Sequence, residues 1–242
     1  MTPFRSALNS ARWTILRKLG GHHPAMLIRD LLAEREVRTV LDVGANRGQY
    51  GRFLRDKAGF RGRIVSFEPV PAVADILRGA AAGDPSWDVV EAALSGCERQ
   101  VDFQVARDTL FSSVLPVAES GREIYGDRAE AVERISLRTR RLDTILPELG
   151  VDPRSERVFL KCDTQGNDLA VIDGAGGLLE HFVGVQAEVA FRQAYAGAAN
   201  GLADVTAVLS RAGFELAGLS PVVTRSFVIY EADACFVNGR YA

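Results

Sequence analysis

Two stretches of this chain decide its fold: Val40-Leu41-Asp42-Val43-Gly44-Ala45-Asn46-Arg47-Gly48 and, further along, Ser66-Phe67-Glu68-Pro69. Their order is that of a buried strand, a glycine turn, a helix and a second strand that ends at an acid. A turn of this kind brings backbone and a helix N-terminus close to a ligand, and the acid can bind ribose hydroxyls. Glu68 follows Gly44 by 24 residues, close to the ~20 expected of a nucleoside-binding unit. The sequence therefore predicts a nucleoside site.

The glycine spacing indicates which kind of nucleoside is bound. Gly44 and Gly48 form a G-x-x-x-G pattern, whereas a pyrophosphate-binding turn has the pattern G-x-G-x-x-G. Asn46 and Gln49 stand where two of the three fingerprint glycines would be. Asn tolerates left-handed backbone better than most residues, and Gly48 allows the next helix to pack close to the strand. The pattern disfavours a dinucleotide and favours a mononucleoside without phosphates.

The two acids of this unit each have two interpretations. Asp42 lies inside a predicted buried strand, where an unpaired carboxylate is costly. It either organises the glycine turn and contacts a cationic amino group of the ligand, or it caps local backbone donors. Glu68 either binds the ribose or caps the helix that begins after Pro69.

Composition and charge limit the classes of partner. Of the 242 residues, 47% are hydrophobic and 25% are charged, as in ordinary globular proteins. A net charge of −2 creates no strong field for nucleic acid, so no nucleic-acid partner is expected. Three widely separated cysteines and the lack of an apolar signal segment predict a reduced, cytoplasmic location. Association into a homodimer is left open.

Residues 1–38 are predicted to form an N-terminal helical cap. Residues 4–19 show a helical pattern of apolar side chains and contain no acid. This basic helix either packs on the domain or contacts an anionic membrane surface or lipid-linked substrate. Gly20-Gly21 and Pro24 separate it from a second predicted helix at 25–35.

Strands and helices alternate over the rest of the chain, which predicts one domain over residues 39–242. The pattern predicts a doubly wound α/β fold with a mostly parallel seven-stranded sheet and an antiparallel last strand. Its strands are expected at 39–43, 63–67, 87–92, 158–162, 183–189, 214–219 and 227–237. A helix is expected at 168–181. Between 94 and 142 the alternation of elements is less regular, but alternating apolar residues at 101–105 and 135–139 predict two half-exposed strands. We interpret 108–127 as a functional loop or lid.

Five segments resemble, in order, those of FkbM-type S-adenosylmethionine-dependent methyltransferases: residues 40–50, 66–71, 92–96, 141–146 and 159–174. The resemblance covers about residues 39–237 and implies the Rossmann-like fold of class I methyltransferases. Residues 41–48 resemble the cofactor loop of that family. Residues 160–168 resemble its second signature, but Gln165 replaces the usual Glu and Asp168 is an added acid.

The resemblance implies methyl transfer from S-adenosyl-L-methionine to a hydroxyl oxygen of a small molecule, a sugar or a glycosylated natural product. The catalytic candidates are Asp163, Lys161 and Glu188, near the ends of the fourth and fifth strands. Asp163 is the first choice for orienting or deprotonating the acceptor, and its alternative role is to cap the next helix. The implied cofactor-binding residues are Asp42, Gly44, Ala45, Asn46, Gly48, Tyr50, Glu68, Pro69, Ala93, Leu94 and Asp163.

Several alternatives remain open. Asp143, Asp163 and Glu188 could together form an oxygen-only Mg²⁺ site. A catalytically weak S-adenosylmethionine-binding module is the second functional interpretation, suggested by Gln165. An NAD(P)-dependent oxidoreductase is the third, disfavoured by the missing glycines and by the lack of an obvious Tyr-x-x-x-Lys pair. Residues 191–195 form either an aromatic, basic acceptor wall or a surface loop.

Overall fold

The computed structural model describes residues 24–241 of the chain. The predicted basic helix at 4–19, with its two interpretations, lies outside the described residues. The second predicted helix is present as α2 (Pro24–Glu34), and its Ile28, Leu31 and Leu32 are buried against the central sheet. None of the helices within 24–241 is long and apolar enough to cross a membrane.

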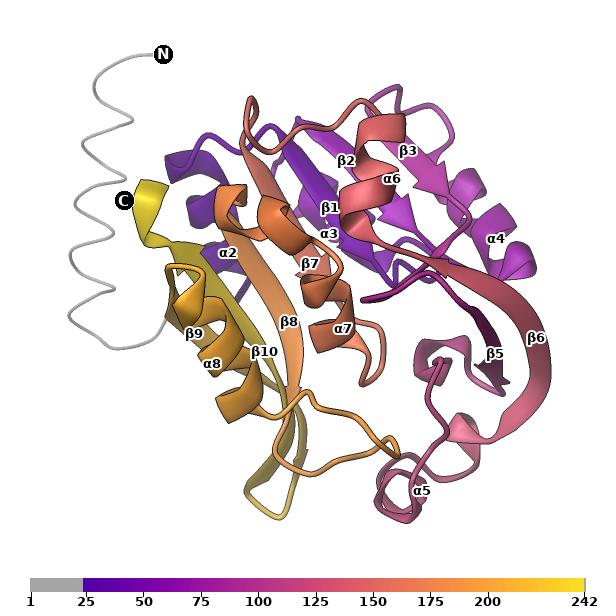
Figure 1. The fold of residues 1–242 in the computed structure, drawn as a ribbon. Helices are drawn as coiled ribbons and strands as arrows, with labels where there is room; N and C mark the ends of the chain where they lie inside the picture. The colour runs from indigo at the N-terminus through magenta and orange to yellow at the C-terminus, as the bar shows by residue number, and fades with distance from the viewer. Residues whose placement is uncertain (1–23, 242) are drawn as a thin grey trace.

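A seven-stranded sheet forms the centre of the described structure, in the order β3-β2-β1-β7-β8-β10-β9 (Figure 1). Neighbouring strands from β3 to β8 are parallel, and β10 is antiparallel to both β8 and β9. This arrangement confirms the predicted sheet and its antiparallel strand. The strands are β1 (Thr39–Val43), β2 (Arg63–Phe67), β3 (Trp87–Val90), β7 (Val158–Cys162), β8 (Gly184–Ala190), β9 (Phe214–Arg225) and β10 (Val228–Asn238).

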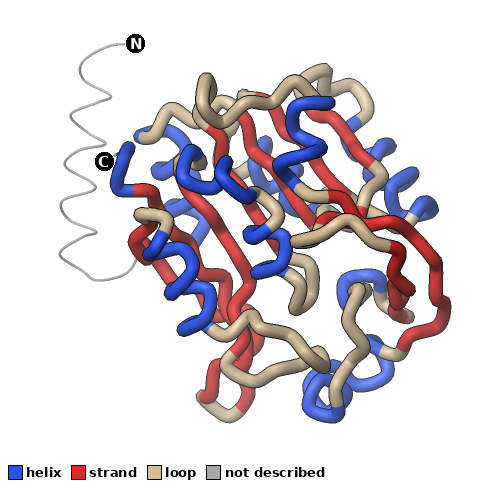
Figure 2. Tube along the Cα trace, viewed as in Figure 1, coloured by secondary structure: helices blue, strands red, loops and turns tan. Residues whose placement is uncertain are grey.

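Helices cover both faces of this sheet, as Figures 1 and 2 show. Every residue of β1 is buried, and alternate residues enter different apolar clusters, with Val40 in one and Leu41 in the other. This is why the strand reads as a continuous apolar run. Residues of α2, α3 and α4 join the Val40 cluster, and residues of α6, α7 and α8 join the Leu41 cluster. These helices are α3 (Gln49–Asp56), α4 (Pro71–Ala81), α6 (Leu142–Glu148), α7 (Asp168–Asp173) and α8 (Leu202–Arg211).

The helix predicted at 168–181 is divided in two, so that prediction is wrong in detail. The helix α7 ends at Asp173, and a 3-10 helix, η3 (Gly176–His181), follows. A Cβ atom on Gly174 would lie 2.5 Å from the carbonyl oxygen of Ser95, and Gly176 has a φ of +51°. The two glycines therefore bring the chain close to Ser95 and turn it there.

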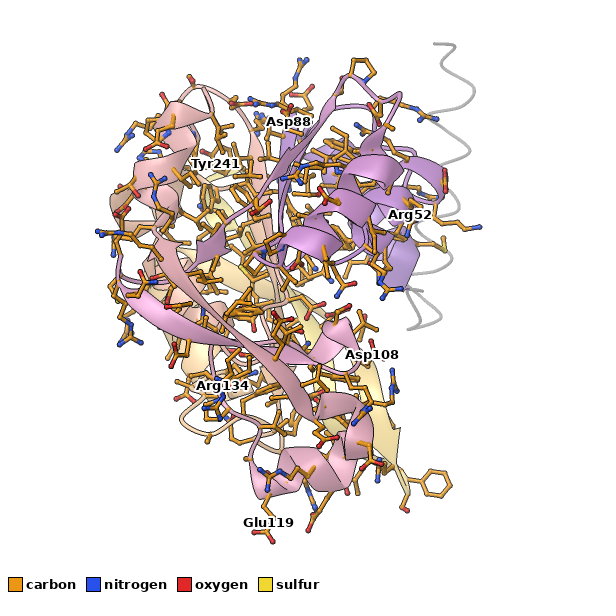
Figure 3. All side chains as sticks on the ribbon, turned by 90° about the vertical axis from the view of Figure 1, so that its right-hand side faces the viewer. Arg52, Asp88, Asp108, Glu119, Arg134 and Tyr241 are labelled. Atoms are coloured by element: carbon orange, nitrogen blue, oxygen red, sulfur yellow. The ribbon has the colours of Figure 1, made fainter. Side chains whose placement is uncertain are left out.

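A second, three-stranded sheet lies beside the main one, in the order β4-β6-β5. The strands β5 (Gln100–Ala106) and β6 (Ala131–Arg140) match the expected half-exposed strands, and β4 (Ala93–Leu94) pairs with the end of β6. The segment at 108–127, expected to be irregular, contains η1 (Thr109–Phe111) and α5 (Glu119–Tyr125), and η2 (Gly126–Ala129) follows. The last 3-10 helix is η4 (Gly239–Tyr241), near the C-terminus. Figure 3 turns this region toward the viewer, with Asp108, Arg134 and Glu119 labelled on it.

Candidate functional site

The predicted glycine turn and the end of β7 meet in the structure. Gly44 has a φ of +77°, and a Cβ atom there would lie 1.9 Å from the carbonyl oxygen of Asp163. The backbone N–H of Asp163 donates to the carbonyl of Val43 at 3.0 Å. A side chain at position 44 would therefore separate the two strand ends, which is the physical reason for glycine there.

The rest of the turn has the backbone that the sequence predicted. Asn46 has a φ of +46° and Gly48 a φ of +81°. A Cβ atom on Gly48 would lie 3.0 Å from Leu77 and 3.3 Å from Trp87, so the helix α3 packs tightly against its neighbours. Ala45 is buried in the same apolar cluster. The turn is thus held in place by the side chains of α4 and β3 that pack against it.

Glu68 links this turn to the start of α4. Its carboxyl oxygens accept the backbone N–H groups of Asn46 at 3.0 Å and of Val70 at 2.9 Å. The side chain is only 6% exposed. Burial raises the pKa of Glu68 to about 7, against the opposing effect of the two backbone donors. The carboxyl group therefore orders the turn, and each oxygen keeps a second lone pair for a ligand hydroxyl.

Asp42, Lys161 and Asp163 form a chain of charges at the ends of β1 and β7. Lys161 Nζ lies 3.2 Å from Asp42 Oδ1 and 3.6 Å from Asp163 Oδ2. The Ser66 hydroxyl donates to the second oxygen of Asp42 at 3.2 Å. Asp42 is fully buried, so the cation that it contacts in this structure is Lys161. Asp163 is 38% exposed and is the one of these three charged side chains that reaches open space.

Lys161 stays protonated at neutral pH. Burial opposes its charge, but the carboxylates of Asp42 and Asp163 outweigh burial, so the pKa of Lys161 is raised. Its Nζ lies 5.2 Å from the ring centroid of Tyr50, whose hydroxyl donates to Gln186 at 2.9 Å. Lys161 therefore cannot act as a base; it holds the two carboxylates, and Tyr50 packs against it.

A narrow cleft follows the ends of β1 and β4 and encloses about 40 Å³. Residues from four of the predicted segments line it together, among them Gly44, Pro69, Ala93, Leu94 and Asp163. Thr164 also lines the cleft, and its buried Oγ1 has no hydrogen-bond partner in the described structure. An unpaired buried hydroxyl is unfavourable unless a ligand or water satisfies it.

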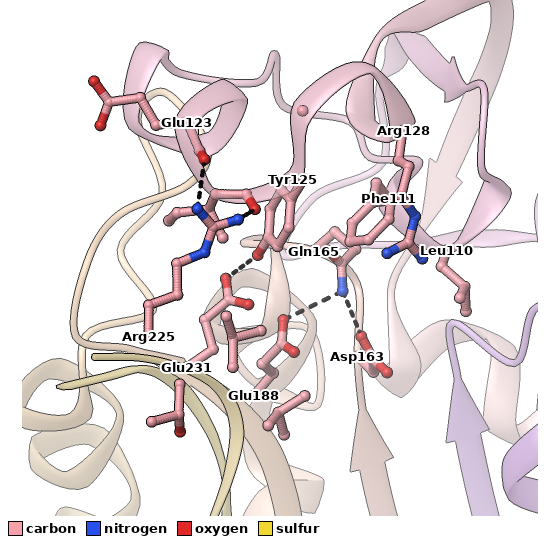
Figure 4. A pocket seen from close by; sticks show the side chains of 15 residues that line it. Leu110, Phe111, Glu123, Tyr125, Arg128, Asp163, Gln165, Glu188, Arg225 and Glu231 are labelled. Atoms are coloured by element: carbon pink, nitrogen blue, oxygen red, sulfur yellow. Dashed lines mark hydrogen bonds between the residues drawn. The ribbon is translucent and has the colours of Figure 1, made fainter. Parts of the chain in front are cut away.

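A larger pocket of about 570 Å³ lies on the other side of Asp163 (Figure 4). Its walls come from segments far apart in the sequence: η1, α5, the ends of β7 and β8, and the hairpin of β9 and β10. The rings of Phe111 and Tyr125 lie 4.4 Å apart, centroid to centroid, on one wall. Polar lining residues include Asp163, Gln165, Glu188 and Glu231. This volume is in the range of small-molecule sites.

Gln165 connects the polar groups of this pocket. Its Nε2 donates to Asp163 Oδ1 at 2.8 Å and to Glu188 Oε2 at 3.2 Å, as Figure 4 shows. Its Oε1 accepts the hydroxyl of Tyr195 at 2.8 Å. Gln165 has a φ of +55°, which directs its side chain across the strand ends. Glutamine thus supplies donors to two carboxylates, which a glutamate at this position could not do while ionised.

Sequence reasoning missed Tyr125 and Glu231. The Tyr125 hydroxyl donates to Glu231, which is 3% exposed. A signal for Glu231 was present, because Glu231 and Asp233 alternate with apolar residues along a buried strand, where acids are uncommon. Tyr125 had no such signal, since α5 shows no clear period. Of the expected acceptor wall, Tyr195 joins the pocket's hydrogen bonds, whereas Phe191 is exposed.

The alternative Mg²⁺ site is not supported. Asp143 at the start of α6 is paired with Arg141, and its oxygens lie next to Gly176 rather than beside Asp163 and Glu188. Within residues 24–241, no group of three or more His, Cys, Asp or Glu side chains is arranged to hold a metal ion. Asp143 instead helps to anchor α6 to the turn after α7.

Comparison with known proteins identifies the family. The model of the methyltransferase FkbM domain matches residues 42–216, which include the glycine turn and the Lys161–Asp163 strand end. The chain belongs to the FkbM methyltransferase family. No curated protein sequence matches significantly.

Solved structures agree with this family at the level of fold. The FkbM methyltransferase from Methylobacillus flagellatus KT superposes with a TM-score of 0.53 at 14% identity, over 83% of this chain and 44% of the other. The chain thus spans less than half the length of that FkbM protein. Weaker likenesses include Aeropyrum pernix fibrillarin with bound S-adenosyl-L-methionine (TM-score 0.45, 14% identity, 83% of this chain and 66% of the other). Another is the magnesium protoporphyrin IX methyltransferase of Synechocystis PCC 6803, with a TM-score of 0.44 at 12% identity, over 98% of this chain and 95% of the other.

Proposed function

We propose that this protein transfers a methyl group from S-adenosyl-L-methionine to a hydroxyl oxygen of a small molecule, a sugar or a glycosylated natural product. One observation carries the proposal. The narrow cleft and the larger pocket share Asp163 in their linings. A donor in the cleft and an acceptor in the pocket would therefore meet at a partly exposed carboxylate.

The cleft residues fit the cofactor. Thr164 Oγ1 offers an unsatisfied buried polar atom, and the Glu68 oxygens retain lone pairs for ribose hydroxyls. Pro69, Ala93 and Leu94 give apolar surface on which a base can pack. The cleft's 40 Å³ is too small for a nucleoside. The cleft must therefore widen to admit the cofactor, and Ser112 and Val114, which line it, belong to the segment that would move outward.

The bound cofactor supplies an electrophilic methyl group on a sulfonium. Asp163 would accept the proton of the acceptor hydroxyl as that oxygen takes up the methyl group. Alignment of the two reacting atoms contributes much of the acceleration. Gln165 and Lys161 hold the Asp163 carboxylate at 2.8 and 3.6 Å. Glu188, bonded to the same Gln165 amide, orients the acceptor.

Binding and turnover test this proposal separately. Titration calorimetry with S-adenosylhomocysteine, NAD and NADP is expected to give binding of S-adenosylhomocysteine alone; binding of a dinucleotide alone would overturn the cofactor assignment. A panel of hydroxylated sugars and glycosides is then incubated with radiolabelled methyl donor. Methylation of an oxygen is expected for a member of the panel. Cofactor binding with methylation only of nitrogen or carbon acceptors would overturn the assignment of the hydroxyl acceptor.

A further inference from the structure

The floor of the large pocket contains two buried carboxyl groups that are open to a ligand. Glu188 is 5% exposed and Glu231 is 3% exposed. In the β8–β10 register Glu188 lies opposite Asp233, so Glu231, two residues away, is its diagonal neighbour on the same face. Figure 4 shows the two side chains next to each other at the pocket floor.

One oxygen of each carboxyl group already has a protein partner. Glu188 Oε2 accepts from Gln165 at 3.2 Å, and Glu231 Oε1 accepts from the Tyr125 hydroxyl. The other oxygen of each group accepts no hydrogen bond from the described residues, and both side chains line the pocket. Two nearly buried carboxyl groups thus each direct an unpartnered oxygen into an open cavity.

The hydrogen-bond donors and cations around the floor are already engaged. Arg225 donates to the backbone carbonyls of Glu123 and Ile124. Arg128 donates to Asp108 at 2.7 Å and stacks on Phe111 at 4.8 Å. Lys161 is shared between two other carboxylates and does not line this pocket. Among residues 24–241, a ligand at the floor therefore finds acceptor oxygens and no cation without a partner.

The electrostatics of the floor agree with this description. Burial, and then the charges of Asp163 and Glu231, raise the pKa of Glu188. Burial also raises the pKa of Glu231. Ionisation of either group is therefore unfavourable while the pocket is empty, because no cation among residues 24–241 pairs with it. A cationic ligand would satisfy the free oxygens and the charge together.

We propose that the acceptor of this pocket bears a protonated amino group that binds between Glu188 and Glu231, as in an amino sugar, with its reacting hydroxyl at Asp163. This inference rests on the proposed function and deepens it. Glu188 and Glu231 line the large pocket and not the cleft, so the amino group belongs to the acceptor and not to the methyl donor. The stacked rings of Phe111 and Tyr125 provide a wall for the apolar face of the sugar ring. Phosphorylated or carboxylated sugars fit less well, because the donors around the floor are already engaged by other protein groups.

The test compares matched ligands on the protein saturated with S-adenosylhomocysteine. Dissociation constants of glucosamine, glucose and N-acetylglucosamine are measured by ligand-observed NMR at neutral pH. Glucosamine is expected to bind about tenfold more tightly than either neutral sugar, since a charge-assisted hydrogen bond is replaced by a neutral one in the others. Equal affinities, or no binding of glucosamine, overturn the amino-sugar assignment.

Two matched variants locate the effect. Glu231→Gln keeps an acceptor for Tyr125 and removes one charge, and it is expected to abolish the preference for glucosamine. Glu123→Gln removes one charge from an exposed side chain that points away from the cavity in Figure 4, and it is expected to leave the preference unchanged. Loss of the preference in both variants, or in neither, overturns the assignment. Calorimetry with S-adenosylhomocysteine and methylation of neutral sugars report on the proposed function independently of these outcomes.

Discussion

The narrow cleft and the larger pocket, the proposed sites of cofactor and acceptor, are built in opposite ways. One wall of the cleft comes from a single strand–turn–helix–strand unit, and the turn of that unit is fixed by the Gly44 backbone approach and by the carboxyl group of Glu68. The pocket is an open space of about 570 Å³ with walls from five separate segments. We therefore expect the cofactor side to depend on backbone geometry and the acceptor side to depend on hydrogen bonds between side chains far apart in the sequence.

Gly44→Ala should break the donor side and have the largest effect. The new Cβ would overlap the Asp163 carbonyl at 1.9 Å, and position 44 has a left-handed φ. We expect a loss of more than about 4 kcal/mol in the free energy of unfolding, measured by urea denaturation. Gly59→Ala is the control: its φ is +67° with nothing within 4 Å of the new atom, so only about 1 kcal/mol is expected. Similar losses in both variants would refute the close-approach argument.

Glu68→Gln should change how the free energy of unfolding depends on pH. The folded-state pKa of about 7 exceeds the ordinary value of 4.5, so the folded protein binds more protons between these values. This contribution of Glu68 is fully present below pH 4.5 and is lost as pH rises through about 7, in total about 3 kcal/mol. The variant lacks this dependence. Its unfolding free energy relative to wild type is therefore expected to rise by that amount across the window, as thermal or urea unfolding at several pH values can show. A difference that is constant with pH would mean that Glu68 is ionised throughout.

Asp163→Asn should lower turnover far more than cofactor affinity, and so distinguish the acceptor side from the cofactor side. The substitution preserves shape but removes the proton acceptor, so kcat is expected to fall about 100-fold. The affinity for S-adenosylhomocysteine should change by much less, because the turn is held by Gly44 and Glu68. Single-turnover methyl transfer and calorimetry measure the two quantities. Equal losses in both would assign Asp163 to cofactor binding instead of catalysis.

Tyr195→Phe should affect the acceptor side alone and is the smallest change. It removes the hydroxyl that donates to Gln165 at 2.8 Å and approaches the Phe111 carbonyl at 3.1 Å. Loss of this bond frees the Gln165 amide to turn, which is expected to cost about 1 kcal/mol of transition-state stabilisation. The measured effect would be a roughly fivefold lower kcat/KM with unchanged cofactor affinity. Tyr230→Phe deletes the same atom from a tyrosine that stacks on Arg192. An equal effect in both would make the Gln165 contact irrelevant.

Prediction from sequence succeeded where interactions are local. The turn at Gly44 to Gly48 and the acid at Glu68 were predicted from spacing, and the mostly parallel seven-stranded sheet was predicted from the alternation of elements. The second sheet was missed, because β6 pairs with β5 in one direction and with β4 in another, and no periodicity encodes such pairing. The break after Asp173 was also missed, since it depends on the approach of Gly174 to Ser95.

The sequence alone predicts the glycine turn without a pyrophosphate pattern and the acid that follows it at the expected distance. These features are local, because a strand, its turn and the next strand are neighbours along the chain. Only the tertiary structure decided that Lys161 is committed to two carboxylates, that Gln165 bridges Asp163 and Glu188, and that Glu231 joins them from β10. These contacts join residues up to 119 positions apart in sequence, as for Asp42 and Lys161. Packing of the sheet and its hairpin, which no local pattern specifies, brings them together.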